Sequence, residues 1–379
     1  MKFSISRSQF IKTLNDVQRA IASKATIPIL TGLKIAVSET GVTLTGSDAD
    51  ISIEATITQS DEKAQLLIEE PGNIVLPARF FGEIVKRLPE DQMTLTVGEG
   101  FQTTITSGTS SFNLNGLDAN GYPHLPEIDA ENKLTLPADI LKQIISQTVI
   151  AVSNQESRPI LTGVHILVKD NQLLAVATDS HRLSQRKLEI NNGQGLEYDV
   201  IIPGKSLTEL SKIITDDLEE VDLRITENQV LFTAGPIKFY SRLLEGNYPD
   251  TDRLIPHDAT TTIEFNTQKL LASVERASLL SHASQNNVVR LVLDPEAKEG
   301  TIYSNSPELG NVQESLAFEN LTGEKLDISF NPDYMKDALR SFGPTDIKVA
   351  FTSALRPFTL VPSEDEENFI QLITPVRTF

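Results

Sequence analysis

Residues 158–183 read RPILTGVHILVKDNQLLAVATDSHRL, and residues 27–52 read IPILTGLKIAVSETGVTLTGSDADIS, a partial copy of the first stretch. Both hold a Thr-Gly pair, then alternating apolar residues, then an aspartate at the following turn. The two aspartates, Asp48 and Asp179, are 131 positions apart, as are the other matching residues. A fixed long offset indicates a repeated structural unit, so the sequence predicts similar domains in a row.

The later stretch carries residues that its copy lacks. They are Arg158, His181, Arg182 and Leu183, and their counterparts are Ile27, Asp50, Ile51 and Ser52. A basic and apolar cluster that the repeated fold does not require indicates a binding site. A surface salt bridge beside a strand end is the alternative interpretation.

The repeat extends to a third unit. Each unit begins with a short strand and a helix, and its second half has a strand, a helix entered near a proline, and further alternating strands. The pattern is roughly β-α-β-β-β-α-β-β-β, an α+β fold of three tandem similar domains, each with two helices packed on antiparallel sheets. The expected helices are 6–21, 77–89, 137–152, 203–215, 266–282 and 332–342. The expected domains are 1–127, 128–255 and 256–379, with linkers near 126–130 and 254–259.

Composition narrows the class of protein. No window approaches 18 consecutive apolar residues, the first residues lack the apolar segment of a signal peptide, and cysteine is absent. These features favour a protein of the reducing cytoplasm. The net charge of −19 argues against a nucleic-acid partner, unless the charge is unevenly distributed.

The charge is indeed uneven. The six expected helices hold thirteen Lys and Arg against seven Asp and Glu. Basic residues without interleaved aromatics suit sequence-independent contact with phosphates, whereas ordinary solvated helix faces are the alternative. The candidate DNA-facing residues are Lys12, Arg19, Lys24, Arg79, Lys86, Arg87, Lys142, Lys205, Lys212, Lys269, Arg276, Lys336 and Arg340.

The sequence offers no catalytic motif. Residues 179–181, Asp-Ser-His, are neighbours on an extended segment, where they point to alternate sides and cannot form a proton relay. Residues 204–206, Gly-Lys-Ser, resemble the end of a phosphate loop, but the loop's first glycine is replaced by Asp199. Asp48 and Asp50 suit a turn better than a metal site, and the five histidines lack ligand spacing. We therefore expect neither a cofactor nor a metal.

Five motifs carry a family resemblance. They are IPILTGLKI (27–35), ATDSHRL (177–183), GNYPD (246–250), NPDYM (331–335) and LITPVRTF (372–379). With them the whole chain resembles the bacterial DNA polymerase III beta subunit, the replicative sliding clamp. The resemblance implies a head-to-tail homodimer closed into a ring of six similar domains, with twelve helices facing duplex DNA. It also implies no catalysis, and tethering of the polymerase, the clamp loader and repair proteins.

The resemblance also implies two sets of site residues. The dimer interface matches Phe112 and Leu114 of the first domain and Leu279 and Leu280 of the third, for which core positions are the alternative. A groove between the second and third domains would bind short peptides with aliphatic or aromatic anchors and an acidic residue. It matches Arg158, Leu161, Thr178, Ser180, His181, Arg182, Leu183, Pro249, Arg253, Leu254, Asn331, Tyr334, Leu355, Pro357, Thr374, Pro375, Val376 and Arg377. The chain continues for two residues beyond Arg377.

Two other functions compete with the clamp. One is a scaffold that binds peptides alone, with the basic helices incidental. The other is a metal-dependent nucleic-acid enzyme that uses Asp48 and Asp50. Binding to circular DNA that is lost on linearisation would distinguish a clamp from both.

Overall fold

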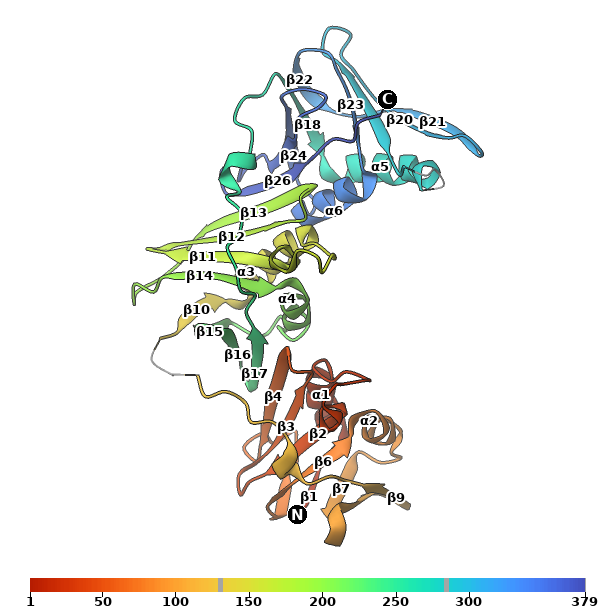
Figure 1. The fold of residues 1–379 in the computed structure, drawn as a ribbon. Helices are drawn as coiled ribbons and strands as arrows, with labels where there is room; N and C mark the ends of the chain where they lie inside the picture. Colours follow the sequence, from red (N-terminus) through yellow and green to blue (C-terminus); the bar gives the residue numbers. More distant parts are fainter. Residues whose placement is uncertain (129–131, 283–285, 379) are drawn as a thin grey trace. The chain divides into compact units, whose positions relative to one another are not determined.

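The computed structural model describes residues 1–128, 132–282 and 286–378, and a similar order of elements (strand, helix, several strands, helix, three strands) occurs in it three times (Figure 1). The last residues of the expected linker 126–130 lie outside the described residues. The chain divides into two compact units, Met1–Asp139 with Glu209–Leu243, and Ile140–Thr208 with Leu244–Phe379. The division passes through the middle copy because its strands pair with strands of both neighbouring copies.

The first copy has five strands between its helices, where three were expected. Its short strand β5 reads LIEE and is largely exposed, so the sequence lacks the alternation of apolar and polar residues that would mark a strand. The elements are β1 (Lys2–Ser6), α1 (Arg7–Gln18), β2 (Gly32–Val37), β3 (Gly41–Ser47), β4 (Ile51–Thr58), β5 (Leu67–Glu70), β6 (Gly72–Pro77), α2 (Ala78–Arg87), β7 (Gln92–Val97), β8 (Gln102–Ser107) and β9 (Ser110–Asn115).

The second copy has four strands between its helices. The elements are β10 (Leu134–Pro137), α3 (Ala138–Thr148), β11 (Gly163–Lys169), β12 (Gln172–Thr178), β13 (Arg182–Glu189), β14 (Tyr198–Pro203), α4 (Gly204–Ser211), β15 (Glu220–Ile225), β16 (Gln229–Ala234) and β17 (Ile237–Arg242).

In its described residues, the third copy again has five strands between its helices. The additional strand β22 is exposed like β5. The elements are β18 (Thr261–Asn266), α5 (Thr267–Ser281), β19 (Val289–Asp294), β20 (Glu299–Ser306), β21 (Gly310–Ser315), β22 (Glu319–Gly323), β23 (Leu326–Phe330), α6 (Pro332–Phe342), β24 (Asp346–Phe351), β25 (Phe358–Pro362) and β26 (Phe369–Ile373).

Among the described residues all strand pairings are antiparallel, and each unit holds two sheets. In the first unit the orders are β5-β1-β7-β8-β9 and β10-β15-β16-β17-β4-β3-β2-β6. In the second they are β14-β11-β12-β13-β26-β25-β24-β18-β22 and β21-β20-β19-β23. Two junctions between copies are thus continuous sheet, through β4 with β17 and through β13 with β26. The expected fold class is confirmed.

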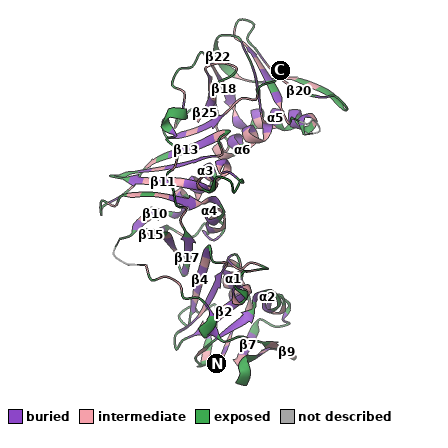
Figure 2. Ribbon diagram, viewed as in Figure 1, coloured by how far each residue is buried: buried purple, intermediate pink, exposed green. Residues whose placement is uncertain are grey.

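Helical periodicity explains the burial pattern (Figure 2). On α1, the residues Phe10, Leu14 and Val17 follow one face and are fully buried, and α1 packs on β3, β4 and α2. In the second unit α5 packs on α6 and β20 above a core that includes Val274 and Phe330.

Within the described ranges, no helix is long and apolar enough to cross a membrane.

The expected bounds of five helices were too wide, and only 332–342 agrees with the structure. Ile213 and Ile214 continue the helical spacing of α4 and are buried, but they follow its last residue. Apolar spacing shows which residues face the core and does not fix where a helix ends. As a result, Arg19 and Lys212 lie just beyond the ends of α1 and α4.

Candidate functional site

The turn between β12 and β13 is held by Asp179. Its Oδ1 accepts hydrogen bonds from the backbone N–H groups of His181 (2.9 Å) and Arg182 (3.0 Å). Ser180, at the tip of the turn, has a φ of 78°, a left-handed backbone conformation that residues other than glycine rarely adopt. The aspartate therefore fixes the conformation of the turn between the two strands.

The first copy builds the same turn around Asp48. Its Oδ1 accepts hydrogen bonds from the backbone N–H groups of Asp50 (3.0 Å) and Ile51 (2.9 Å), and Ala49 has a φ of 79°. The interpretation of this aspartate as a turn residue is confirmed. In the part of the chain that the structure describes, no three His, Asp or Glu side chains gather as metal ligands would.

Arg182 connects the turn to α6. Its Nε donates to Asp179 Oδ2 at 3.1 Å, and its Nη1 donates to Asp337 Oδ2 at 2.7 Å. The guanidinium carbon lies 4.4 Å from the ring centroid of Tyr334, and the His181 ring lies 6.5 Å from that ring and nearly parallel to it. Arg182 is thus held by two carboxylates and an aromatic ring.

Beneath the turn lies an apolar cluster of Val176, Leu183, Ile255 and Leu372. Tyr248 packs against this cluster, stacks on His165 at 4.8 Å, and accepts a hydrogen bond from the backbone N–H of Thr178 at 3.0 Å. Burial raises the pKa of the Tyr248 phenol to about 12. The cluster gives the turn a firm apolar base, which includes the predicted site residue Leu183 and is linked to Thr178 through Tyr248.

The C-terminal tail runs alongside the turn. In β26, Ile373 pairs with Arg182 and Leu372 with Leu183. The backbone N–H of Thr374 then donates to the His181 carbonyl at 2.9 Å, and that of Val376 donates to the Ser329 carbonyl at 2.8 Å. We define the junction surface as the residues of the turn and tail, namely Thr178, residues 180–183, Tyr334 and residues 374–377, together with the predicted site residues Arg158 and Leu161.

The remaining predicted site residues are less directly connected. Arg158 donates to Ser180 Oγ at 3.2 Å, and Asn331 caps α6 by accepting a hydrogen bond from the Asp333 N–H at 2.8 Å. The others are Pro249, Arg253, Leu254, Leu355 and Pro357, and among the described residues none of them shares a hydrogen bond or ring contact with the turn. Leu254 and Leu355 are nevertheless exposed apolar side chains, 48% and 57% accessible.

Eleven of the thirteen candidate DNA-facing bases fall into two classes, and the other two, Lys142 and Lys205, belong to neither. Six form ion pairs with carboxylates: Arg19, Arg87, Lys212, Arg276, Lys336 and Arg340. Five others are exposed and form no ion pair within the described ranges: Lys12, Lys24, Arg79, Lys86 and Lys269. The second class provides the stronger attraction for an external anion.

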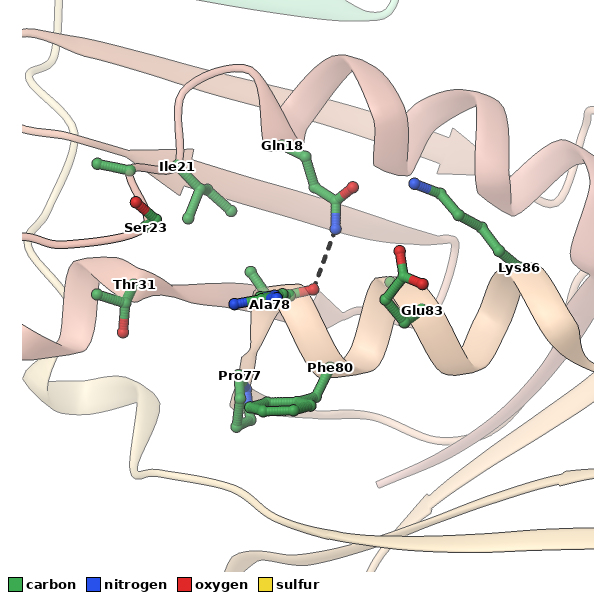
Figure 3. Close-up of a pocket in the computed structure, with 12 residues that line it drawn as sticks. Gln18, Ile21, Ser23, Thr31, Pro77, Ala78, Phe80, Glu83 and Lys86 are labelled. Carbon is green, nitrogen blue, oxygen red and sulfur yellow. Dashed lines mark hydrogen bonds between the residues drawn. The ribbon is translucent and has the colours of Figure 1, made fainter.

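Figure 3 shows how α1 and α2 are held together beside these bases. Gln18 Nε2 donates to the Ala78 carbonyl at 3.0 Å, and its amide fills the space where a side chain at Gly82 would lie. The two helices border a pocket of about 460 Å³ that is also lined by Phe80 and Lys86. The helix pair therefore carries its bases on a fixed scaffold.

The predicted interface residues lie on sheet edges and on α5. Phe112, 39% exposed, and Leu114 are on β9, an edge strand of the first unit. Leu279 is 73% exposed and Leu280 is half-buried on α5. For Leu279 the alternative interpretation as a core residue is wrong. Sequence reasoning missed further exposed apolar residues, among them Phe80 (64%) and Leu309 (67%), because no periodicity marks a single exposed side chain.

α5 is tied to the edge strand β21. Arg276 Nη2 and Ser273 Oγ donate to Glu314 Oε1 at 2.5 and 2.7 Å, and Arg276 Nε donates to Glu314 Oε2 at 2.9 Å. The hydrogen bond from Arg276 is the main reason that the pKa of Glu314 falls to about 2. The carboxylate therefore stays ionised down to strongly acidic pH and keeps α5 and β21 together.

Comparisons with known proteins cover every copy of the repeat. Family models of the DNA polymerase III beta subunit match residues 1–126 (N-terminal domain), 135–250 (central domain) and 252–377 (C-terminal domain). The chain is 51% identical to the beta sliding clamp of Bacillus subtilis over 380 residues, with 100% of both chains covered. It is 49% identical to that of Streptococcus pneumoniae over 379 residues, with 99% of both covered. The crystal structure of the DNA polymerase sliding clamp from Bacillus subtilis matches with a TM-score of 0.96 at 51% identity, with 100% of both chains covered.

Proposed function

Since this chain belongs to the family of the DNA polymerase III beta subunit, the bacterial sliding clamps, we propose that two copies close into a ring around duplex DNA and hold the polymerase on its template. The clamp is a processivity factor and is not itself catalytic. The observation that carries the proposal is 51% identity over the whole length of a beta sliding clamp. We propose three similar domains, 1–127, 128–255 and 256–379, so that the ring contains six.

The repeat itself supports a head-to-tail dimer. β4, β13 and β21 hold the same place in their copies, as do β17, β26 and β9. β4 pairs with β17 and β13 pairs with β26, whereas β21 and β9 are sheet edges in the described chain. The third junction of this series is β21 of one protomer with β9 of its partner. A head-to-tail contact of this kind closes into a ring when successive copies are related by similar rotations.

The two internal junctions also suggest the register of this third junction. Ile53 lies opposite Phe239, and Ser184, the counterpart of Ile53, lies opposite Gln371. The same register sets Val312 of β21 opposite Phe112 of the partner subunit's β9. Val312 already packs against the core of its own unit. The pairing would bury Phe112 and would satisfy the open backbone groups of both edges.

A second apolar contact follows from the internal junction at α6. Tyr334, the third residue of α6, lies against His181, the residue before β13. Their counterparts are Phe80, the third residue of α2, and Leu309, the residue before β21. Both counterparts are exposed in the single chain, and we propose that they meet across the dimer interface. The proposed interface is Phe112, Leu114, Leu279 and Leu280, extended by Phe80 and Leu309.

The uneven charge fits a ring that surrounds DNA. A chain of net charge −19 would repel DNA from its outer surface, while basic helices lining the hole would attract phosphates without reading bases. Because the ring would be retained by topology, its contacts with DNA need not be tight. We propose the thirteen bases named above as the inner surface, and the unpaired ones as its strongest contacts.

Replacing Lys12, Lys24, Arg79 and Lys86 together by alanine should weaken binding to duplex DNA and shorten residence on circular DNA. Each lost phosphate contact should also reduce the salt dependence, by about 0.9 in the slope of log affinity against log salt concentration. Fluorescence anisotropy with labelled duplex at several salt concentrations measures both quantities.

The matched control removes the same charge away from the proposed inner surface. Lys63, Lys169, Lys187 and Lys298 are exposed and are not among the thirteen proposed bases, so their replacement by alanine should leave the salt slope unchanged. An equal loss of affinity in the control would mean that total charge, and not the proposed inner surface, attracts DNA.

The junction surface is the proposed groove for short peptides of the replicative polymerase, the clamp loader and repair proteins. The apolar base around Leu183 would receive aliphatic or aromatic anchors, and residues 374–377 would form one wall. Arg182 would act mainly by holding Tyr334 and the turn in place, because both of its carboxylate partners are already bound. Arg158 and Arg377 are exposed and would meet an acidic residue of the peptide. We infer that the protein works in the cytoplasm, at the nucleoid.

A further inference from the structure

A row of polar side chains crosses the sheet that joins the first two copies. Lys34 of β2 pairs in register with Thr45 of β3, which pairs with Glu54 of β4. Glu54 in turn pairs with Lys238 of β17. Side chains that lie opposite each other in neighbouring strands point to the same face of the sheet. The four residues therefore form one line across the junction between the copies.

The counterpart row at the second junction contains neither lysine nor glutamate. The residues that pair in register there, in the same order, are His165, Val176, Gln185 and Ile370. Val176 is a member of the buried apolar cluster beneath the turn, and Ile370 packs against that cluster. The repeated fold thus accepts neutral residues where the first junction has Glu54 and Lys238. The charged residues of the row indicate a function that the fold itself does not require.

The row borders a pocket of about 420 Å³ on this face of the sheet. The linker residues 123–128 also line the pocket, together with Leu231 and Tyr240. Pockets that bind small ligands have volumes of about 300–1,000 Å³. The pocket is therefore large enough for a small organic acid or for one or two residues of a peptide.

Three hydrogen-bond donors of the pocket lack an acceptor within the described ranges. Thr45 and Tyr240 are only 4% and 9% exposed, and neither hydroxyl forms a hydrogen bond there. Lys34 is half-buried, and its ammonium lies 6.0 Å from the Tyr122 ring centroid. Burial, aided by the nearby Glu54 carboxylate, raises the pKa of the Tyr240 phenol, so that it keeps its proton. Buried donors without an acceptor are costly, and a ligand that supplies an acceptor recovers this free energy.

The charges of the lining leave one cation uncompensated. Lys238 Nζ lies 3.8 Å from Glu54 Oε1, so these two charges largely offset each other. Glu127 is exposed on the linker, where water weakens its field. Lys34, in contrast, forms no ion pair with any carboxylate of the described residues. The pocket therefore attracts one negative charge.

We propose that the pocket binds a carboxylate, with the Lys34 ammonium as its ion-pair partner and the hydroxyls of Thr45 and Tyr240 as its hydrogen-bond donors. The one unpaired ammonium matches the single charge of a carboxylate. A phosphate carries about two charges and would be repelled more strongly by Glu54. The pocket thus selects a carboxylate over a phosphate.

Two sources supply such a carboxylate: a small organic acid in solution, or the aspartate or glutamate side chain of an extended peptide. None of the lining residues belongs to the junction surface. The pocket therefore binds its ligand whether or not the proposed groove binds peptides, and the site goes beyond the proposed clamp function.

The Lys34 ammonium can be observed directly by NMR in the full-length protein. Reductive methylation with ¹³C-formaldehyde labels the lysines and preserves their charge, and Lys34→Arg identifies the Lys34 signal by its loss. The probes are glutarate as a free acid, the capped tripeptide Ac-Gly-Glu-Gly-NH2 as an acidic peptide, and Ac-Gly-Gln-Gly-NH2 as its neutral match. We expect the Lys34 signal to shift saturably with glutarate or with the glutamate peptide, with a dissociation constant of about 1 mM, and not with the glutamine peptide.

A conservative variant tests the hydroxyl contact. Tyr240→Phe removes one donor and keeps the ring, so it should weaken binding of the carboxylate about fivefold. Tyr198→Phe is the matched control, because Tyr198 is on β14 of the second copy and does not line the pocket. This control should leave the affinity unchanged.

Tighter binding of glutarate would identify a free acid as the ligand, and tighter binding of the glutamate peptide would identify an acidic side chain. Either result supports the site. The proposal is overturned if neither probe moves the Lys34 signal, if the glutamine peptide shifts it equally, or if Tyr240→Phe binds with undiminished affinity.

Discussion

Replacing Phe112 and Leu280 together by alanine is expected to convert the dimer into soluble monomers. Phe112 would lie opposite Val312 of the partner subunit, and Leu280 would pack beside the paired edges. Truncating a buried large apolar side chain costs about 2–5 kcal/mol, so two truncations at one interface should raise the dissociation constant by several orders of magnitude. Sedimentation velocity over a range of concentrations measures the change.

The monomers should remain folded, because Phe112 is 39% exposed and Leu280 half-buried in the single chain. A matched control is Leu67→Ala with Phe101→Ala: both side chains are exposed, and Leu67 is on β5, the opposite edge of the same sheet. This control should stay dimeric. If the chain with Phe112→Ala and Leu280→Ala remains a dimer at low concentration, the interface lies elsewhere.

Deleting residues 375–379 is expected to weaken every partner peptide at once, because all would share one groove. Loss of a wall and of the contacts that it orders should reduce affinity by about 2–4 kcal/mol, or roughly 30- to 1000-fold. Arg182→Glu should have a similar effect, since it breaks the contacts to Asp179, Asp337 and Tyr334 and opposes an acidic peptide. Calorimetry with a QLxLF-type peptide measures both.

Dimerisation and DNA binding should survive the deletion, which separates the groove from the ring. Replacement of Lys325 by Glu is a suitable control, because that lysine is exposed and pairs with Asp294, and neither residue belongs to the proposed groove. Full-strength peptide binding by the truncated chain would remove residues 374–377 from the proposed groove.

The sequence predicted the first two copies, because an offset of 131 positions preserves apolar spacing and turn residues together, and it predicted the third from the recurring order of strands and helices. It also predicted the turn at Asp179, since the local pattern determines an aspartate turn. It did not predict the partners of Arg182, because Asp337 and Tyr334 lie on α6, more than 150 positions away in the chain. Contacts between distant segments depend on strand register, and a single sequence does not reveal the register.

The short strands β5 and β22 were missed for a different reason. Both are exposed strands at the edges of their sheets. They lack the alternation of apolar and polar residues that marks a strand in a sequence. Phe80 and Leu309 are single exposed side chains that no periodicity marks, whereas their counterparts Tyr334 and His181 stack on each other within the chain.

The central claim, that two copies enclose duplex DNA, is tested most directly by topology. The protein is loaded onto a closed circular plasmid by the clamp loader, free protein is removed by gel filtration, and half of the complex is linearised with a restriction enzyme. We expect the protein to remain on the circle and to leave the linear DNA by sliding off its ends. Equal retention on circular and linear DNA, or no retention on either, would contradict an enclosing ring.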